Sequence, residues 1–281
     1  MTSLLDALYA QVPPADARIA YGADAHQFGE LRLPSATTHG PGSYPVVIVL
    51  HGGYWRAQYG LEYCGQACAA LAAAGLATWN VEYRRIGDPG GGWPNTFLDV
   101  AAAVDSLRAL AAQHPLDLAR VAALGHSAGG QLALWLAGRS RIPAASPLAP
   151  ATMGAPLPLR GVVALAGVVH LRRAWELRLS GNVVESLLGG APLVVPDRYA
   201  AASPYELAPL GPDIRQLLLH GADDENVPVS QSEEYTAHAR ALGDDAQLTL
   251  LPATGHFEPV APTTPQWQTT LAAVRDALGR R

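Results

Sequence analysis

The sequence predicts a single α/β domain, 1–281, with a mostly parallel central sheet and helices on both faces. The 281 residues are 49% apolar and only 15% charged, which suits one large core and leaves little room for disorder. Short apolar runs alternate with longer helical patterns along the chain, as in folds built on a parallel sheet. No repeat or linker divides the composition, so a second domain is not expected.

The first half of the chain is expected to supply five strands and two helices. Two segments near the N-terminus alternate as antiparallel strands do, and the run PVVIVL at 45–50 predicts a strand buried on both faces. Gly75 should end the first helix, because glycine accepts the left-handed conformation at a helix C-terminus. The expected strands are 18–21, 27–33, 45–50, 76–83 and 121–125, and the expected helices are 63–74 and 95–114.

The second half continues the alternation and carries two longer connections. The Pro-rich stretch 139–160 is expected as a surface excursion, and about 171–210 is long enough for a small cap insertion. The expected strands are 162–169, 216–220 and 247–251, and the expected helices are 128–136, 230–242 and one from Pro265. Parallel sheets bind ligands beyond the carboxyl ends of their strands, so the loops there are the candidates for function.

Composition excludes several classes of function. All 19 basic residues are arginine, so lysine Schiff-base chemistry and the lysine-dependent phosphate loop are excluded. The net charge is −5 and no basic run exceeds two arginines, so nucleic acid is not an expected partner. No uninterrupted apolar stretch reaches about 18 residues and the N-terminus lacks a basic leader, so we expect no membrane partner and a cytoplasmic location.

The two cysteines are expected to be structural. Cys64 and Cys68 would share one face of a helix, where the functional alternatives are a redox pair and half of a metal site. Because no further ligands lie nearby in sequence, two buried thiols are the favoured interpretation. We expect no metal and no cofactor.

The segment 125–129 (GHSAG) fits the pattern G-x-S-x-G between a strand and a helix. Such a tight turn exposes a serine hydroxyl above the sheet, and its small flanking residues relieve crowding of the backbone. We therefore predict that Ser127 is a nucleophile, the alternative being an ordinary serine at a helix N-terminus.

A serine nucleophile needs a base and an acid that orients the base. His256 follows the last expected strand on the side of Ser127, whereas His220 is expected to pack at a strand end and His238 to lie in mid-helix. The acid should follow the preceding strand, where Asp224 is favoured and Asp223 is the alternative.

Backbone N–H groups should stabilise the negative charge that develops on a carbonyl oxygen during acyl transfer. The segment 51–55 (HGGYW) follows a buried strand, and its glycines allow a close backbone approach. We predict oxyanion donors at Gly53 or Tyr54 and at Ala128, with His51 bracing the loop. Trp55 and Trp93 are candidates for substrate contact, and Trp55 equally suits the core.

Four motifs in this order resemble the α/β-hydrolase superfamily: HGGYW at 51–55, GHSAGG at 125–130, HGADDENVP at 220–228 and GHF at 255–257. The resemblance covers nearly the whole chain and implies the α/β-hydrolase fold with a Ser-Asp-His triad. Within the superfamily, HGG-x-W is similar to the kynurenine formamidase (arylformamidase) group, which hydrolyses N-formyl-kynurenine. The stretch HLRR at 170–173 departs from that group, which often has an acidic residue there.

The expected function is that of a serine hydrolase acting on a small-molecule ester or aryl formamide through an acyl-enzyme. A generalist carboxylesterase without formamidase activity stays open, as does a non-catalytic binding protein on a hydrolase fold. An arginine of the cap, such as Arg172, Arg173 or Arg178, would clamp a substrate carboxylate or else be a solvated helix charge. The sequence leaves the oligomeric state undetermined.

Overall fold

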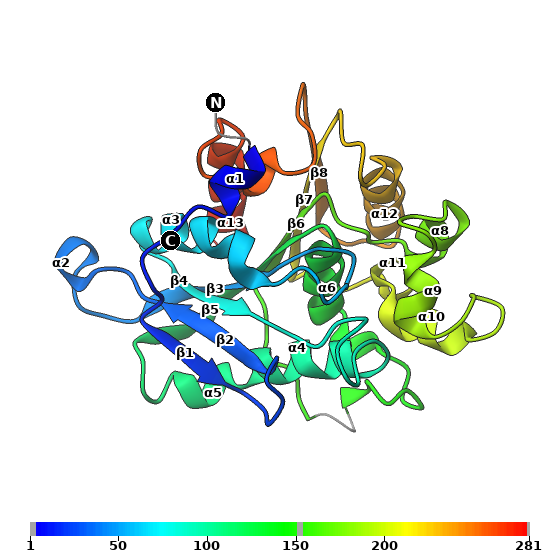
Figure 1. The fold of residues 1–281 in the computed structure, drawn as a ribbon, viewed down its shortest axis with the longest axis horizontal. Helices are drawn as coiled ribbons and strands as arrows, with labels where there is room; N and C mark the ends of the chain where they lie inside the picture. Colours follow the sequence, from blue (N-terminus) through cyan, green and yellow to red (C-terminus); the bar gives the residue numbers. More distant parts are fainter. Residues whose placement is uncertain (1–3, 151–153, 280–281) are drawn as a thin grey trace.

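The computed structural model describes residues 4–150 and 154–279, which build one eight-stranded sheet (Figure 1). The strand order is β1-β2-β4-β3-β5-β6-β7-β8. The pairs β1–β2 and β2–β4 are antiparallel, and all the other neighbouring pairs are parallel, which confirms the predicted mostly parallel sheet. The strands are β1 (Ala17–Ala20), β2 (Phe28–Arg32), β3 (Tyr44–Leu50), β4 (Ala77–Val81), β5 (Leu116–His126), β6 (Gly161–Leu165), β7 (Arg215–Gly221) and β8 (Ala246–Leu251).

Strand β3 lies inside the sheet and is buried on both faces, as its apolar run predicts. Val46 and Ile48 belong to one apolar cluster, and Val47 and Val49 belong to a second cluster on the opposite face. Helices α4 and α6 contribute to the first cluster, and α1, α3 and α13 contribute to the second (Figure 1). These helices are α1 (Leu4–Leu8), α3 (Gly65–Ala73), α4 (Asn95–Asp105), α6 (Ala128–Ala137) and α13 (Trp267–Ala277).

The segment predicted as a cap, about 171–210, connects β6 to β7 and contains four short helices. They lie together beside α12 at one side of the molecule (Figure 1). The four cap helices are α8 (Leu171–Glu176), α9 (Val183–Leu188), α10 (Pro196–Ala202) and α11 (Pro204–Leu207), and α12 spans Ser230–Ala241. That this segment covers a substrate stays a prediction.

Several elements differ from the expected boundaries. The strand expected over 162–169 already ends at Leu165. The helix expected over 95–114 is interrupted after α4, where the Ser106 hydroxyl donates to the Ala103 carbonyl at 2.7 Å, and a short helix α5 (Leu107–Leu110) follows. A serine that bonds back to the preceding turn bends a helix. Strand β5 begins at Leu116 rather than 121, and its pairing with β3 is shifted between Pro45 and Val46. Proline has no N–H to donate, which suits this irregularity. The described residues also form two further helical turns, α2 (Ala36–His39) and η1 (Leu61–Cys64), and the short 3-10 turns η2 (Arg139–Arg141) and η3 (Glu258–Val260).

The Pro-rich stretch 139–160 lies largely at the surface, as expected, but a few of its side chains reach the core; its residues 151–153 lie outside the described residues. Leu148 and Ala149 are buried, and the Arg139 guanidinium is buried against the Asp105 carboxylate at 2.7 Å. The same carboxylate accepts the backbone N–H of Leu157 at 2.8 Å. This carboxylate therefore anchors both ends of the stretch to the core.

The two cysteines are the buried thiols that the sequence predicts. Cys64 and Cys68 are both free and buried, and burial raises the pKa of Cys68 to about 12. Neither thiol is therefore ionised near neutral pH. Among the helices described, none is both long enough and apolar enough to cross a membrane.

Candidate active site

Ser127 occupies the tight turn between β5 and α6. Its backbone has a positive φ of 56°, with ψ −120°, which is uncommon for a residue other than glycine. A Cβ atom on Gly125 would lie 2.0 Å from the Gly129 carbonyl oxygen, and one on Gly129 would lie 2.1 Å from the Leu50 carbonyl oxygen. The glycines of the motif are therefore required by backbone contacts on both sides of the serine.

Asp224 and His256 are joined by a short hydrogen bond, in which His256 Nδ1 lies 2.6 Å from Asp224 Oδ2. The loops that carry them follow β7 and β8, and both side chains are almost completely buried. Asp223 is exposed, and its backbone N–H donates to the Thr254 carbonyl. Of the two acids that the sequence left open, the structure therefore brings Asp224 to the histidine.

The Asp224 carboxylate is surrounded by donors. Its Oδ1 accepts the backbone N–H groups of Asn226 and Val227 at 2.8 and 2.9 Å, and His220 Nε2 lies 3.3 Å from Oδ2. Burial raises the pKa of Asp224, but the hydrogen bonds from His220 and His256 outweigh burial and hold this pKa well below its usual range. The Asp224 carboxyl group that contacts His256 is therefore ionised at neutral pH.

A chain of hydrogen bonds links His256 to the loop after β3. The Gly52 N–H donates to Tyr63 Oη, which lies 2.9 Å from His126 Nδ1, and His126 Nε2 lies 2.9 Å from the His256 carbonyl oxygen. Because Tyr63 accepts from Gly52, its own hydrogen is directed to His126 Nδ1, and Nε2 carries the proton of the ring. Burial and the neighbouring His256 lower the pKa of His126 to about 3, which keeps this ring neutral.

This arrangement places His256 beside the turn that carries the serine. His126 immediately precedes Ser127, and the ring centroids of His126 and His256 are 4.6 Å apart. A Cβ atom on Gly52 would lie 2.8 Å from the Ser127 Cβ, so the backbone of the loop after β3 lies against the serine as well. Three separate loops therefore meet at Ser127.

The predicted oxyanion loop has an unusual backbone. Gly53, Tyr54 and Trp55 have φ values of 103°, 52° and 54°, and such strained conformations cluster at functional loops. The Tyr54 hydroxyl donates to the Asn226 carbonyl at 2.5 Å, which connects this loop to that of Asp224. Ala128 is the first residue of α6, where a backbone N–H has no acceptor within the helix.

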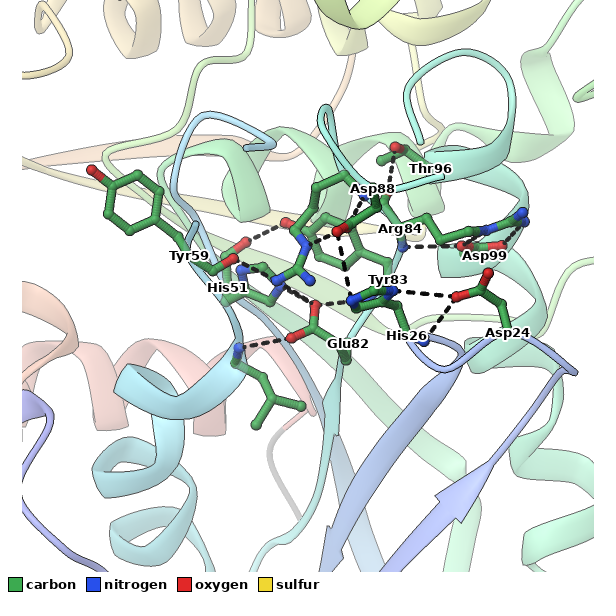
Figure 2. Close-up of polar contacts among 12 residues, drawn as sticks. Asp24, His26, His51, Tyr59, Glu82, Tyr83, Arg84, Asp88, Thr96 and Asp99 are labelled. Atoms are coloured by element: carbon green, nitrogen blue, oxygen red, sulfur yellow. Dashed lines mark hydrogen bonds and ion pairs between the residues drawn. The ribbon is translucent and has the colours of Figure 1, made fainter. Parts of the chain in front are cut away.

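His51 braces this loop, as the sequence suggests. The side chain is fully buried, with Nδ1 2.8 Å from the Gly52 carbonyl oxygen and Nε2 2.9 Å from Glu82 Oε1 (Figure 2). Its ring stacks on the Tyr83 ring at a centroid distance of 4.4 Å. The roles of Glu82, Tyr63 and His220 were not predicted, and only His220 lies in one of the four motifs.

Of the two tryptophans considered for substrate contact, Trp55 belongs to the core. It is 0% exposed, and its indole N–H donates to Gln131 Oε1 at 3.2 Å, so its side chain offers no surface to a substrate. Trp93 is half-buried between Phe97, at a ring distance of 5.8 Å, and the Arg198 guanidinium of α10. It therefore lies where the loop after β4 meets the cap segment.

Two of the three cap arginines have acidic partners within the protein. Arg172 pairs with Glu206 at 2.9 Å and Arg173 pairs with Glu176 at 3.0 Å, whereas Arg178 is exposed. A hollow of about 430 Å³ lies between α9 and the loops after β3 and β4, and is lined by Arg56, Ala57, Gln58, Ile86, Gly87, Val183 and Ser186. A larger hollow of about 990 Å³ lies away from Ser127, near the amino end of β3 and along α13. We place the chemistry with Ser127, because the volume of a hollow by itself defines no reaction.

In the part of the chain that the structure describes, no cluster of three or more His, Cys, Asp or Glu side chains is arranged to hold a metal ion. That the protein works without metal or cofactor stays a prediction.

The strand order and the serine between β5 and α6 define an α/β-hydrolase fold, and solved esterases share it. A truncated carbohydrate esterase from gut microbiota is 21% identical, with a TM-score of 0.76, over 95% of this chain and 99% of that one. Esterase B from Lactobacillus rhamnosis is 22% identical, with a TM-score of 0.78, over 97% and 89%. Esterase 2 from Thermogutta terrifontis is 20% identical, with a TM-score of 0.74, over 95% and 94%.

The chain belongs to the BD-FAE family, whose model matches residues 31–238. No curated protein sequence matches the chain. The resemblance to the kynurenine formamidase group therefore stays a prediction, while the predicted α/β-hydrolase fold is confirmed.

Proposed function

We propose that the protein is a serine hydrolase that cleaves small carboxylic esters through an acyl-enzyme. The observation that carries this proposal is the buried 2.6 Å contact between Asp224 and His256 beside the turn of Ser127. The BD-FAE family and the esterase neighbours support it. Esterase 2 from Thermogutta terrifontis is described as phosphonylated by sarin in one structure and as bound to butyrate in another.

In this proposal Ser127 Oγ attacks the ester carbonyl carbon while His256 Nε2 takes the hydroxyl proton. Asp224 accepts the hydrogen of His256 Nδ1, which leaves Nε2 free to act as the base. The protonated imidazole then donates to the leaving alcohol as the acyl–oxygen bond breaks. Water hydrolyses the acyl-enzyme in a second cycle of the same proton transfers and regenerates Ser127.

The N–H groups of Ala128 and of Gly53 or Tyr54 stabilise the oxyanion in both tetrahedral intermediates. Ala128 donates from the first turn of α6, where the helix dipole adds to the attraction. The contact of Gly52 with the Ser127 side chain brings the second donor segment close to the attacked carbonyl.

Short-chain esters are the proposed substrate class, and aryl formamides are the second candidate. The formamide candidate depends on HGGYW at 51–55 and would give a formyl-enzyme with an aromatic amine as the leaving group. A formamidase should have a shallow acyl pocket that excludes longer acyl chains. A generalist esterase should accept acetyl to about hexanoyl chains, each methylene changing the transition-state energy by about 0.8 kcal/mol at most.

Two measurements test the proposal. Wild-type protein should hydrolyse p-nitrophenyl acetate, and absence of turnover would favour the alternative of a non-catalytic binding protein. The kcat/KM for N-formyl-kynurenine should then be compared with that for a p-nitrophenyl ester series. A formamide value far below the best ester supports the carboxylesterase, whereas a dominant formamide value with rejection of butyryl and longer esters supports the formamidase.

A further inference from the structure

A buried carboxylate, Glu82, lies directly behind the predicted oxyanion loop. It follows β4, and its side chain is only 4% exposed. Its Oε1 lies 2.9 Å from His51 Nε2 and 3.1 Å from Arg85 Nη1, and its Oε2 accepts the Leu61 N–H at 3.2 Å. Figure 2 shows Glu82 pointing at His51 from the end of β4. Burial raises the pKa of Glu82, but His51 and Arg85 outweigh this and lower it, so the group is ionised at neutral pH.

The hydrogen-bond partners of His51 determine where its protons are. Its Nδ1 faces the Gly52 carbonyl and its Nε2 faces the Glu82 carboxylate. A carbonyl and a carboxylate can only accept, so both ring nitrogens carry hydrogen. His51 is therefore a charged donor to the Gly52 carbonyl, and Glu82 compensates the charge of this buried ring.

The bond from His51 to the Gly52 carbonyl fixes the direction of the next N–H. The cis peptide bonds of the described residues lie at Trp93–Pro94 and Ala208–Pro209, so the peptide between Gly52 and Gly53 is trans. In a trans peptide the C=O and N–H point in opposite directions. The Gly53 N–H is therefore aimed away from the His51 ring, and the charged donor on the carbonyl polarises this peptide and strengthens its N–H as a donor.

Arg85 holds the carboxylate in place. Its side chain is 5% exposed, its Nε lies 3.1 Å from Asp88 Oδ2, and its Nη1 donates to the Tyr59 carbonyl at 2.6 Å. The Tyr83 hydroxyl also donates to the His51 carbonyl at 2.8 Å, so the backbone before Gly52 is fixed as well.

We propose that Glu82 is a positioning residue for ester hydrolysis: through His51 and the Gly52 carbonyl, it orients and strengthens the Gly53 N–H as an oxyanion donor. The inference rests on the proposed function and adds to it a group that never touches the substrate. The strengthened Gly53 N–H matters most when negative charge develops on the substrate oxygen. Loss of Glu82 should therefore destabilise the transition state far more than it weakens substrate binding.

The test is the substitution Glu82→Gln, which keeps the shape of the side chain and removes its charge. Removing an oxyanion donor outright costs about 10²–10³-fold in kcat, so misdirecting one should lower kcat for p-nitrophenyl acetate by about 10- to 100-fold. The KM should stay within about threefold. The Kd of an alkyl boronic acid, which forms a tetrahedral adduct on the serine, should rise by the same factor as kcat/KM falls.

Asp99→Asn is the matched control, because Asp99 is a second buried carboxylate of the same region that contacts Arg84 at 2.6 Å (Figure 2). Both variants should lower the melting temperature, but Asp99→Asn should leave kcat and boronate affinity unchanged. A folded Glu82→Gln with wild-type kcat, or a fall in kcat for both variants alike, overturns the inference. Undiminished turnover in Ser127→Ala would instead overturn the proposed function.

A measurement on wild-type protein covers the case in which Glu82→Gln does not fold. In ¹⁵N-histidine-labelled protein at neutral pH, the His51 signals, assigned through contact with the Tyr83 ring, should show hydrogen on both ring nitrogens. Arg85→Gln should also lower kcat, by about 3- to 10-fold, because it removes the group that holds the Glu82 carboxylate in place. A His51 ring with one N–H contradicts the inference, as does an Arg85→Gln variant with wild-type kcat.

Discussion

The side chain of Asp224 shows how single contacts define the candidate site. Four donors converge on this carboxylate: two backbone N–H groups at Oδ1, and His220 and His256 at Oδ2. Because His220 is itself fixed by the Ser232 hydroxyl at 2.8 Å and the Val227 carbonyl at 2.9 Å, the acid has one orientation available. The His256 ring is therefore positioned before any substrate enters.

The first prediction concerns the proposed nucleophile and base. Ser127→Ala and His256→Ala should each lower kcat for p-nitrophenyl acetate by several orders of magnitude, because each removes a group that forms or breaks bonds. Thermal unfolding of Ser127→Ala should match that of wild type, since the Cβ atom that the turn accommodates is retained. Near wild-type turnover in Ser127→Ala would show that another residue is the nucleophile.

The second prediction compares two neighbouring acids. Asp224→Asn should reduce kcat by about 10³- to 10⁴-fold, because an amide cannot hold His256 in the required tautomer. Asp223→Asn should stay within about threefold of wild type, because that side chain is exposed. Steady-state rates for both variants decide the matter, and a larger loss in Asp223→Asn would reverse the assignment.

At this scale the sequence predicts reactive residues better than the groups that position them. Ser127, Asp224 and His256 stand in motifs with fixed local spacing, so pattern alone nominates them. Glu82 and Tyr63 act through contacts between loops that are far apart along the chain. The spacing of apolar residues along the sequence does not predict such contacts. Trp55 was ambiguous for a related reason, because its burial depends on α6 packing over the loop after β3.

At the scale of elements, α6 approaches the sheet unusually closely. The helix begins at Ala128, and Gly129 lies so close to the end of β3 that an added Cβ would be 2.1 Å from the Leu50 carbonyl oxygen and 2.6 Å from that of His51. Both neighbours are backbone atoms, which cannot move independently of β3. The close approach keeps the helix N-terminus near the predicted oxyanion loop.

The third prediction follows from this contact. Gly129→Ala should destabilise the protein by about 3 kcal/mol or more, because the methyl group would force α6 away from β3. Gly65→Ala is the control: Gly65 begins helix α3, an added Cβ would meet only the Val12 side chain, at 3.2 Å, and alanine favours the helix. We expect its cost to stay below about 1 kcal/mol. Urea denaturation measures both values, and equal costs would contradict the argument.

The order and type of the main elements were predictable, but several boundaries were not. The continuous apolar run at 45–50 indicates β3 directly, and Gly75 indicates the end of α3. The early start of β5 and the break after α4 depend on Pro45 and on a single hydroxyl of Ser106, and the apolar pattern continues through both positions. The cap helices are short, so their pattern predicts an insertion without fixing its elements.

For the whole molecule, the buried ionisable groups determine how stability depends on pH. The folded-state pKa of His126 is about 3, below the value of about 6.5 for an unfolded chain. Between these values the unfolded chain binds a proton that the folded protein excludes, so acid favours unfolding. Asp224, whose folded-state pKa is also lowered, adds a second loss as the pH falls below about 3.8.

The fourth prediction is a loss of stability in mild acid. The free energy of unfolding should fall as the pH is lowered from about 6.5 towards 3, with His126 alone contributing at most about 1.4 kcal/mol per pH unit. Urea titrations at pH 7.0, 5.5 and 4.5 measure this slope. A free energy of unfolding that stays constant across this range would mean that His126 takes up its proton without opening the fold.

The hydrogen-bonded chain through Tyr63 and His126 limits how the serine motif can diverge. Both ends of that chain, the Gly52 N–H and the His256 carbonyl, are backbone atoms, which no substitution except proline at position 52 removes. Any replacement pair must therefore span the same gap, with an acceptor towards Gly52 and a donor towards His256. The residue at position 126, between Gly125 and Ser127, therefore depends on the residue at position 63. In related sequences these two positions should change together or not at all.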